Sequence, residues 1–217
     1  MELKGLKINF LGDSITEGYD SSDMEHCYWG LLQKNDGVIA RGYGIAGTRI
    51  AKQQSMFIDP KWDNYFRTRV DKMDPDADVI VIFGGVNDHG HGDAHLGKMS
   101  DRTDDTFYGA LHLLYQEVMK RYPDAQIVAM TPMHYEDEDA LINGYGVRKD
   151  GPLSAYRDAI CEVAEAYDIP VLDVFNKSGI QPKDRELRLL YTSDGLHPND
   201  AGHEIIYKLL KEFLQNL

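Results

Sequence analysis

Short apolar runs of the kind found in buried β-strands recur along the 217-residue chain, and they alternate with stretches of helical periodicity. The clearest run covers residues 78–83, which are β-branched and continuously apolar after the first, as expected for a strand buried on both faces of a sheet. Strands that alternate with helices form parallel sheets with helices on both faces, so the pattern predicts an α/β fold with about five strands. No repeat, low-complexity tract or linker interrupts the pattern, and residues 1–217 are expected to form a single domain.

The expected strands are short and aliphatic, and they cover residues 7–12, 38–40, 78–83, 126–130 and 169–174. The expected helices have apolar residues three and four positions apart, and they cover residues 28–34, 62–73, 106–122, 152–167 and 200–213. In the helix 106–122, Met119 is assigned to the inward face. The glycine-rich segment 41–48 is expected to be a turn, and residues 176–190 are expected to be irregular or partly helical.

The composition excludes several classes of protein. The formal net charge of −13 disfavours nucleic acid and anionic membrane surfaces as partners, and favours solubility. Cys27 and Cys161 form neither a metal-ligand spacing nor a disulfide framework. No apolar run approaches the roughly 18 residues of a membrane span, and the first residues lack the apolar core of a signal peptide. We therefore expect a soluble, cytoplasmic protein, although an exported protein whose leader has been removed would have the same sequence.

Ser14 follows the first expected strand, directly after Gly12 and Asp13. The ends of strands in open α/β sheets face the crevice where ligands bind, so this position suits a nucleophile. A serine hydroxyl also needs a base, an orienting acid and donors for the oxyanion. The alternative interpretation is a capping box, in which Ser14 is the N-cap of a helix and Glu17 completes the motif.

Other segments offer the missing groups. Asp194 and His197 are three residues apart, and in a tight turn the carboxylate could orient the imidazole and stabilise its cation. Asp194 could equally be an ordinary turn residue. Asn87 follows the strongest strand, and Gly47 lies in the turn after the second strand. An amide side chain and a glycine N–H are both suitable oxyanion donors.

Four segments of the chain resemble the four sequence blocks of the SGNH, or GDSL, hydrolase family, in the family's order. They are Gly12-Asp13-Ser14, Gly44-Ile45-Ala46-Gly47, Gly85-Val86-Asn87-Asp88 and Asp194-Gly195-Leu196-His197-Pro198. The resemblance implies a flavodoxin-like three-layer α/β/α sandwich and serine ester hydrolysis.

The resemblance also implies roles for single residues: Ser14 as nucleophile, His197 as general base and Asp194 as its partner. The implied oxyanion donors are the N–H groups of Ser14 and Gly47 and the side chain of Asn87. Asp13 resembles the family's supporting residue, which holds the nucleophile turn by hydrogen bonds. The family often has Asn where this chain has Gly42, which weakens the assignment of Gly47 more than that of the activity.

Two polar clusters require separate consideration. His89, His91, Asp93 and His95 alternate closely, but their spacing matches no common metal-ligand pattern, and the family generally needs no metal. We therefore expect neither a metal nor another cofactor. The acidic run at residues 136–139 is interpreted as a solvated face of the protein.

These features predict a serine esterase that acts through an acyl-enzyme intermediate on short acyl esters, for example O-acetylated carbohydrate. The partner would then be a small-molecule or carbohydrate ester. The alternatives are a thioesterase or lysophospholipase for longer acyl chains, and an acyltransferase that differs only in its acceptor. A non-catalytic carbohydrate-binding module ranks last, because Ser14, Asp194 and His197 are all present.

Overall fold

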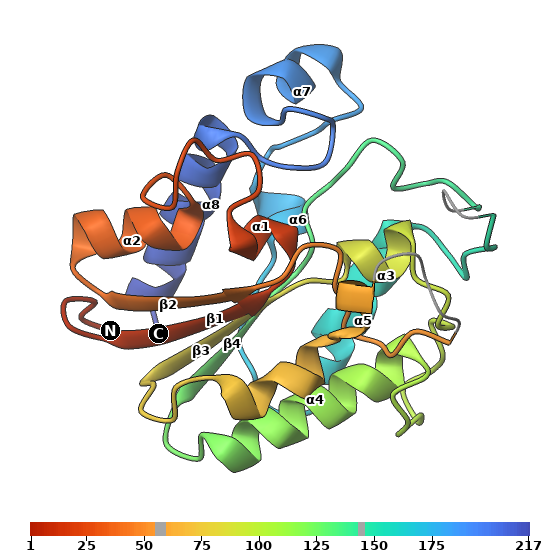
Figure 1. The fold of residues 1–217 in the computed structure, drawn as a ribbon, viewed down its shortest axis with the longest axis horizontal. Coiled ribbons are helices and arrows are strands. Elements are labelled where there is room, and N and C mark those ends of the chain that lie inside the picture. Colours follow the sequence, from red (N-terminus) through yellow and green to blue (C-terminus); the bar gives the residue numbers. More distant parts are fainter. Residues whose placement is uncertain (55–59, 143–145) are drawn as a thin grey trace.

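The computed structural model describes residues 1–54, 60–142 and 146–217. At its centre lies a parallel sheet of five strands in the order β2-β1-β3-β4-β5, with helices on both faces (Figure 1). The strands are β1 (Lys7–Gly12), β2 (Ile39–Gly44), β3 (Val79–Phe83), β4 (Gln126–Met130) and β5 (Val171–Leu172). This strand order is that of the flavodoxin-like fold, so the predicted α/β/α architecture is confirmed.

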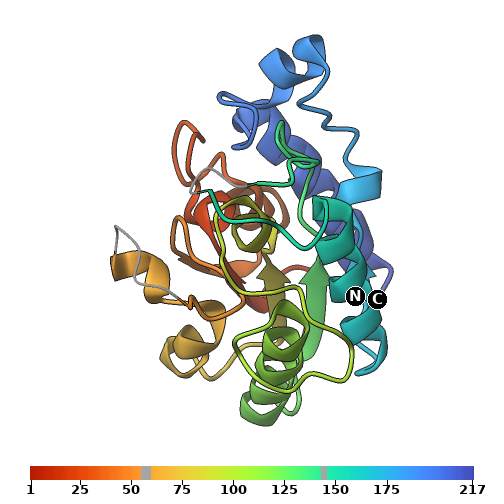
Figure 2. The ribbon, with the colours of Figure 1, turned by 90° about the vertical axis from the view of Figure 1, so that its right-hand side faces the viewer.

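Helices α2 (Tyr28–Asp36) and α8 (Asp200–Gln215) pack together on one face of the sheet. On the other face lie α4 (Phe107–Arg121), α5 (Leu153–Glu165) and the 3₁₀ helix η2 (Phe66–Lys72). The remaining helices are short: α1 (Ser14–Glu17), η1 (Pro60–Asp63), α3 (Val86–Gly90), α6 (Val174–Lys177) and α7 (Arg185–Tyr191). Helix α7 has no buried residue and projects from the body of the protein in both views (Figures 1 and 2).

The two hydrophobic cores follow from the alternation of side chains along each strand. Ile8 and Phe10 of β1 face the core beneath α2 and α8, whereas Leu11 points to the opposite core. Ile80 and Ile82 join Leu11 in the core beneath α4 and α5. All five residues of β3 are buried, which confirms that this run forms the fully covered central strand.

The structure corrects the prediction for the second strand. Strand β2 begins at Ile39 and extends to Gly44, through residues that the sequence assigned to a turn. A Cβ atom on Gly42 would lie 2.6 Å from the ring of Trp29, and one on Gly44 would lie 2.0 Å from the backbone nitrogen of Glu17. These glycines are therefore strand residues that allow α1 and α2 to approach the sheet closely.

Two helix predictions also need correction. The helix expected at 62–73 is replaced by the 3₁₀ helices η1 and η2. With three residues per turn, a 3₁₀ helix aligns residues i and i+3, and Phe66 and Arg69 are both buried on one side of η2. In α4, Met119 is 39% exposed, and Tyr115 is buried in the core instead.

Because the strands are parallel and in register, their carboxyl ends lie at one edge of the sheet, where Gly12 pairs with both Gly44 and Phe83. The segments that follow β1, β2 and β3 carry Ser14, Gly47 and Asn87 respectively. The fold therefore brings three of the four predicted blocks to the same edge. Among the described helices, none combines the length and the apolar character that a bilayer-spanning segment requires.

Candidate active site

Ser14 is the first residue of α1, and it is buried at the carboxyl end of β1. The N-cap of this helix is Asp13, whose Oδ1 accepts a hydrogen bond from the backbone N–H of Ile15 at 3.1 Å. The capping-box interpretation of Ser14 is therefore wrong. Glu17 does not complete a capping box either, because its Oε2 accepts a hydrogen bond from the N–H of Ala46 at 2.5 Å. The hydroxyl of Ser14 is thus free of any capping role.

The hydroxyl of Ser14 instead lies beside His197. Nε2 of His197 is 3.0 Å from Ser14 Oγ, and Nδ1 is 2.7 Å from Oδ2 of Asp194. The other carboxylate oxygen of Asp194 accepts hydrogen bonds from the backbone N–H groups of Leu196 and His197, at 2.9 and 2.7 Å. Burial would raise the pKa of Asp194, but these hydrogen bonds outweigh it and hold the pKa below its usual value. Asp194 is therefore a carboxylate that orients the imidazole.

The turn that carries Asp194 is fixed by its neighbours. Gly195 has a φ of +88°, which favours glycine, and its carbonyl accepts a hydrogen bond from the N–H of Glu136 at 2.9 Å. Arg188 forms an ion pair with Glu136 and donates a hydrogen bond to the carbonyl of Asp194 at 3.2 Å. A Cβ atom on Gly195 would lie 3.0 Å from Glu136 and 3.1 Å from Arg188. The loop after β4 and helix α7 therefore support the turn from outside.

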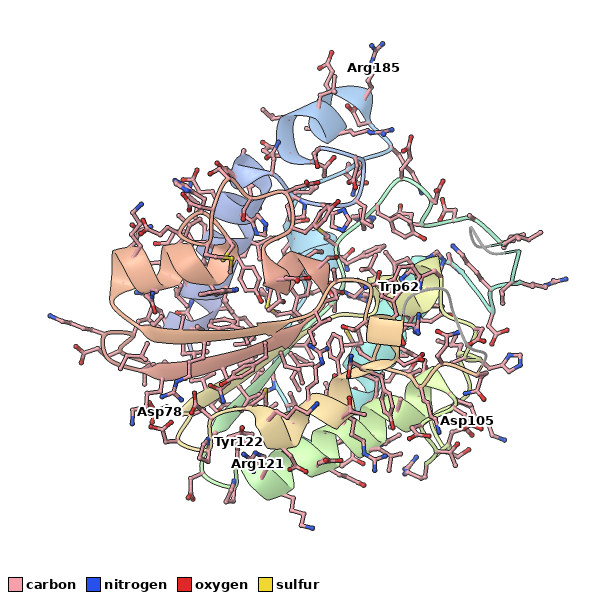
Figure 3. The ribbon with its side chains drawn as sticks, in the orientation of Figure 1. Trp62, Asp78, Asp105, Arg121, Tyr122 and Arg185 are labelled. Atoms are coloured by element: carbon pink, nitrogen blue, oxygen red, sulfur yellow. The ribbon has the colours of Figure 1, made fainter. Side chains whose placement is uncertain are left out.

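Asn87 lies near the start of α3, where its Nδ2 donates a hydrogen bond to the carbonyl of Thr48 at 3.0 Å. This bond joins it to the segment of Gly47, which has a φ of +74°. Trp62 is labelled in Figure 3. Its ring covers Gly47 so closely that a Cβ atom on that glycine would lie 2.2 Å from the indole nitrogen. The segment after β2 and the start of α3 are thus held together at the position predicted for the oxyanion donors.

Asp88 reinforces this junction. Its carboxylate accepts hydrogen bonds from the backbone N–H groups of Ile50 and Ala51, at 3.0 and 2.8 Å. Burial raises the pKa of Asp88 to about 6. Burial likewise raises the pKa of Asp13 to about 6. Asp13 therefore holds the backbone next to Ser14, and Asp88 holds the segment that follows Gly47.

Arg69 is a buried residue of this region that the sequence reasoning missed. Its guanidinium donates hydrogen bonds to the carbonyls of Gly12 and Tyr43, at 3.0 and 2.5 Å, and to the hydroxyl of Thr48 at 3.0 Å. Burial lowers the pKa of Arg69 to about 10, so the group remains a cation at neutral pH. It links the ends of β1 and β2 to the segment of Gly47. Two arginines, Arg67 and Arg69, lie between Phe66 and Val70, and only the i, i+3 spacing of Phe66 and Arg69 in a 3₁₀ helix distinguishes the buried one.

The histidines considered as metal ligands do not converge. His89 Nδ1 is 2.7 Å from the hydroxyl of Tyr135, and His91 Nδ1 is 3.0 Å from Arg49. His95 pairs with Asp150 on the surface. Within the described parts of the chain, the side chains that could share a metal ion are Asp20, Asp194 and His197, but Nδ1 of His197 already bonds Asp194.

The acidic run at residues 136–139 is not simply a solvated face. Glu138 is only 6% exposed, and it pairs with His134 at 2.5 Å and with Lys183 at 2.7 Å. Hydrogen bonds from these two partners outweigh the effect of burial and lower the pKa of Glu138. The run therefore anchors the loop after β4, which in turn supports the turn of Asp194.

Fold and site together define a class of protein: an α/β protein with serine, histidine and aspartate joined by hydrogen bonds at the carboxyl edge of a parallel sheet. The chain belongs to the GDSL-like lipase/acylhydrolase family, which matches residues 10–205. It is 26% identical over 198 residues to a GDSL lipase of Mycobacterium tuberculosis. The aligned region covers 90% of this chain and 76% of the relative. The family identifies the chain as an ester hydrolase.

Solved structures share the fold. The crystal structure of a Lactobacillus plantarum protein superimposes with a TM-score of 0.83 at 30% identity, over 99% of this chain and 98% of that one. An acetyl xylan esterase has the same fold, with a TM-score of 0.64 at 22% identity, over 96% of this chain and all of the other.

Proposed function

We propose that the chain is a serine esterase that forms an acyl-enzyme intermediate on Ser14. The observation that carries this proposal is the continuous series of hydrogen-bond contacts from Asp194 through His197 to Ser14, with distances of 2.7 and 3.0 Å. This geometry matches the requirement that a nucleophile and its base lie within hydrogen-bond reach and that a third group orients the base.

In the proposed mechanism, Nε2 of His197 takes the proton of Ser14 as Oγ attacks the carbonyl carbon of the ester. The negative charge that develops on the carbonyl oxygen is stabilised by the N–H groups of Ser14 and Gly47 and by Nδ2 of Asn87. His197 then gives its proton to the departing alcohol, which leaves Ser14 acylated. Water repeats the sequence, and the carboxylic acid is released. Asp194 holds the imidazole and stabilises its cation throughout.

The proposed substrates are esters of short acyl groups, for example O-acetyl groups on carbohydrate. The side chains beside the proposed oxyanion donors support this choice: Trp62 covers Gly47, and its ring lies against that of His91 with centroids 4.6 Å apart and planes inclined at 32°. The guanidinium of Arg49 lies 3.0 Å from the same histidine. A long acyl chain gains about 0.8 kcal/mol of binding free energy per buried methylene, but only in an apolar groove. The side chains of Trp62, His91 and Arg49 are polar or amphipathic and do not form one. The acetyl xylan esterase that shares the fold is consistent with an acetyl substrate.

The first experiment is labelling with a fluorophosphonate, followed by intact-mass spectrometry. One adduct on Ser14 is expected, and Ser14→Ala should abolish both labelling and ester hydrolysis without loss of the fold. Ser100→Ala, an exposed serine, serves as the control and should label normally. An adduct on another serine, or unchanged turnover in Ser14→Ala, would contradict the mechanism. A series of p-nitrophenyl esters from two to sixteen carbons then tests the acyl preference: an optimum at eight or more carbons would favour the thioesterase or lysophospholipase alternative.

A further inference from the structure

Tyr19 is unlike the other aromatic residues. Among the residues whose side chains the structure describes, it is the only aromatic one that is exposed, with 52% of its surface accessible. Its ring lies against His197, with centroids 4.4 Å apart and planes inclined at 48°. A large exposed ring gains little from the hydrophobic effect, so its place beside the proposed general base calls for a different explanation.

Hydrogen bonds hold the backbone of Tyr19 and its neighbours to the segment of Ser14 and to the segment around His197. Its N–H donates a hydrogen bond to the carbonyl of Ser14 at 2.9 Å. The hydroxyl of Ser193 donates a hydrogen bond to the carboxylate of Asp20, and the N–H of Ser22 donates to Asp200 at 2.8 Å. The ring is therefore exposed but held in place before any ligand arrives, which lowers the ordering cost of binding.

The proposed mechanism, on which this inference rests, indicates which part of the substrate lies next to Tyr19. The oxyanion points toward Gly47 and Asn87, whereas the leaving alcohol must lie within reach of Nε2 of His197 to receive its proton. A group that covers the imidazole of His197 therefore borders the alcohol part of the ester and not its acyl part.

The chemistry around the ring indicates which alcohol fits. One carboxylate oxygen each of Asp20 and Asp194 and one ring nitrogen of His197 lie within 4.8 Å of one another, and both acids are exposed. A sugar ring can place a C–H face on the tyrosine while its hydroxyls donate to carboxylates. A long alkyl alcohol would desolvate these carboxylates without pairing them, and an anionic alcohol would be repelled.

We propose that Tyr19 is a binding residue for the alcohol part of the substrate and that it stacks against the ring of a neutral pyranoside. The site would then select the ester by its alcohol, separately from any selection of the acyl group.

The experiment compares two acetate esters with different alcohols: ethyl acetate and a mono-O-acetylated methyl pyranoside. Tyr19→Ala should lower kcat/KM for the pyranoside ester by about tenfold, mainly through KM, and change that for ethyl acetate by less than about twofold. Tyr19→Phe keeps the ring and should retain most of the activity on both. Met24→Ala, an exposed residue of the same loop, is the matched control and should leave both esters unchanged.

An equal fall in kcat for both esters, with a shifted pH profile, would overturn the proposal, because Tyr19 would then position His197. If the wild-type chain hydrolyses neither ester and takes no fluorophosphonate, the proposed function fails, and binding then decides the role of Tyr19 independently. Saturation-transfer NMR with the unacetylated methyl pyranoside should give signals with the wild type that Tyr19→Ala loses. Equal signals from the two proteins, or none from the wild type, would reject the stacking site.

Discussion

Replacement of Asn87 by alanine should separate a catalytic effect from a structural one within a single variant. Nδ2 of Asn87 carries two hydrogens, and the carbonyl of Thr48 accepts one of them at 3.0 Å. The second hydrogen is the one proposed for the oxyanion. Asn87→Ala removes both hydrogen bonds, but only the second affects the transition state.

The two losses differ in size and in the assay that detects them. Removal of one oxyanion donor costs about 3 kcal/mol of transition-state stabilisation, so kcat should fall roughly 100- to 1,000-fold with little change in KM. Asn87 is only 6% exposed, so the carbonyl of Thr48 loses a buried donor. The free energy of unfolding should therefore fall by about 1–3 kcal/mol.

Steady-state kinetics on a short-chain ester and urea unfolding measure the two effects separately. Ile127→Val in β4 is the matched control: it should lower stability by about 1 kcal/mol and leave kcat unchanged. Asn87→Asp keeps the size of the side chain but has no donor when ionised, so it should be as impaired in kcat as Asn87→Ala. The reasoning would be refuted by a normal kcat with a raised KM in Asn87→Ala, which would make Asn87 a substrate-binding residue.

Three further outcomes are expected. His197→Ala should lower kcat on the order of 10⁶-fold and Asp194→Ala about 10⁴-fold; near-normal kcat in His197→Ala would contradict the triad. Burial lowers the pKa of His203 from 6.5 to about 4, so the unfolded chain binds the proton more tightly and stability should be lost as pH falls from about 6.5 to 4. The histidine should contribute roughly 3 kcal/mol to this loss, so His203→Gln should flatten the pH dependence of urea unfolding, and an unchanged slope would contradict this. EDTA should leave kcat/KM unchanged, and a loss that zinc restores would require a metal in the reaction.

Prediction from the sequence worked best where a residue's environment is set by its own strand or turn. Strands β3 and β4 were predicted because a strand covered on both faces must be apolar throughout. The contact between Asp194 and His197 was predicted because both lie in one short turn. Local sequence carries enough information in these cases.

The predictions failed where contacts with distant segments of the chain determine the local structure. Gly42 and Gly44 indicate a turn by composition, but they are strand residues because Trp29 and α1 occupy the space of their missing side chains. Arg69 was overlooked because its three acceptors lie on segments up to 57 residues away. The contact of Tyr19 with His197 could not be predicted, because the two residues lie far apart in the sequence.

The hydrogen-bond contact between Ser14 and His197 joins positions 183 residues apart, the first at the start of the sheet and the second immediately before α8. Such a contact closes a loop of 183 residues, and contacts this distant in sequence form late in folding because of the entropy lost on loop closure. A nascent chain that has not yet reached residue 197 would hold Ser14 without its base, so ester hydrolysis could begin only after that turn has been synthesised and has packed against α1. Conversely, local detachment of α8 would separate the two side chains while the sheet remains folded. Activity would then be lost at lower denaturant concentrations than those that melt the sheet, which makes turnover a sensitive reporter of the docking of this helix.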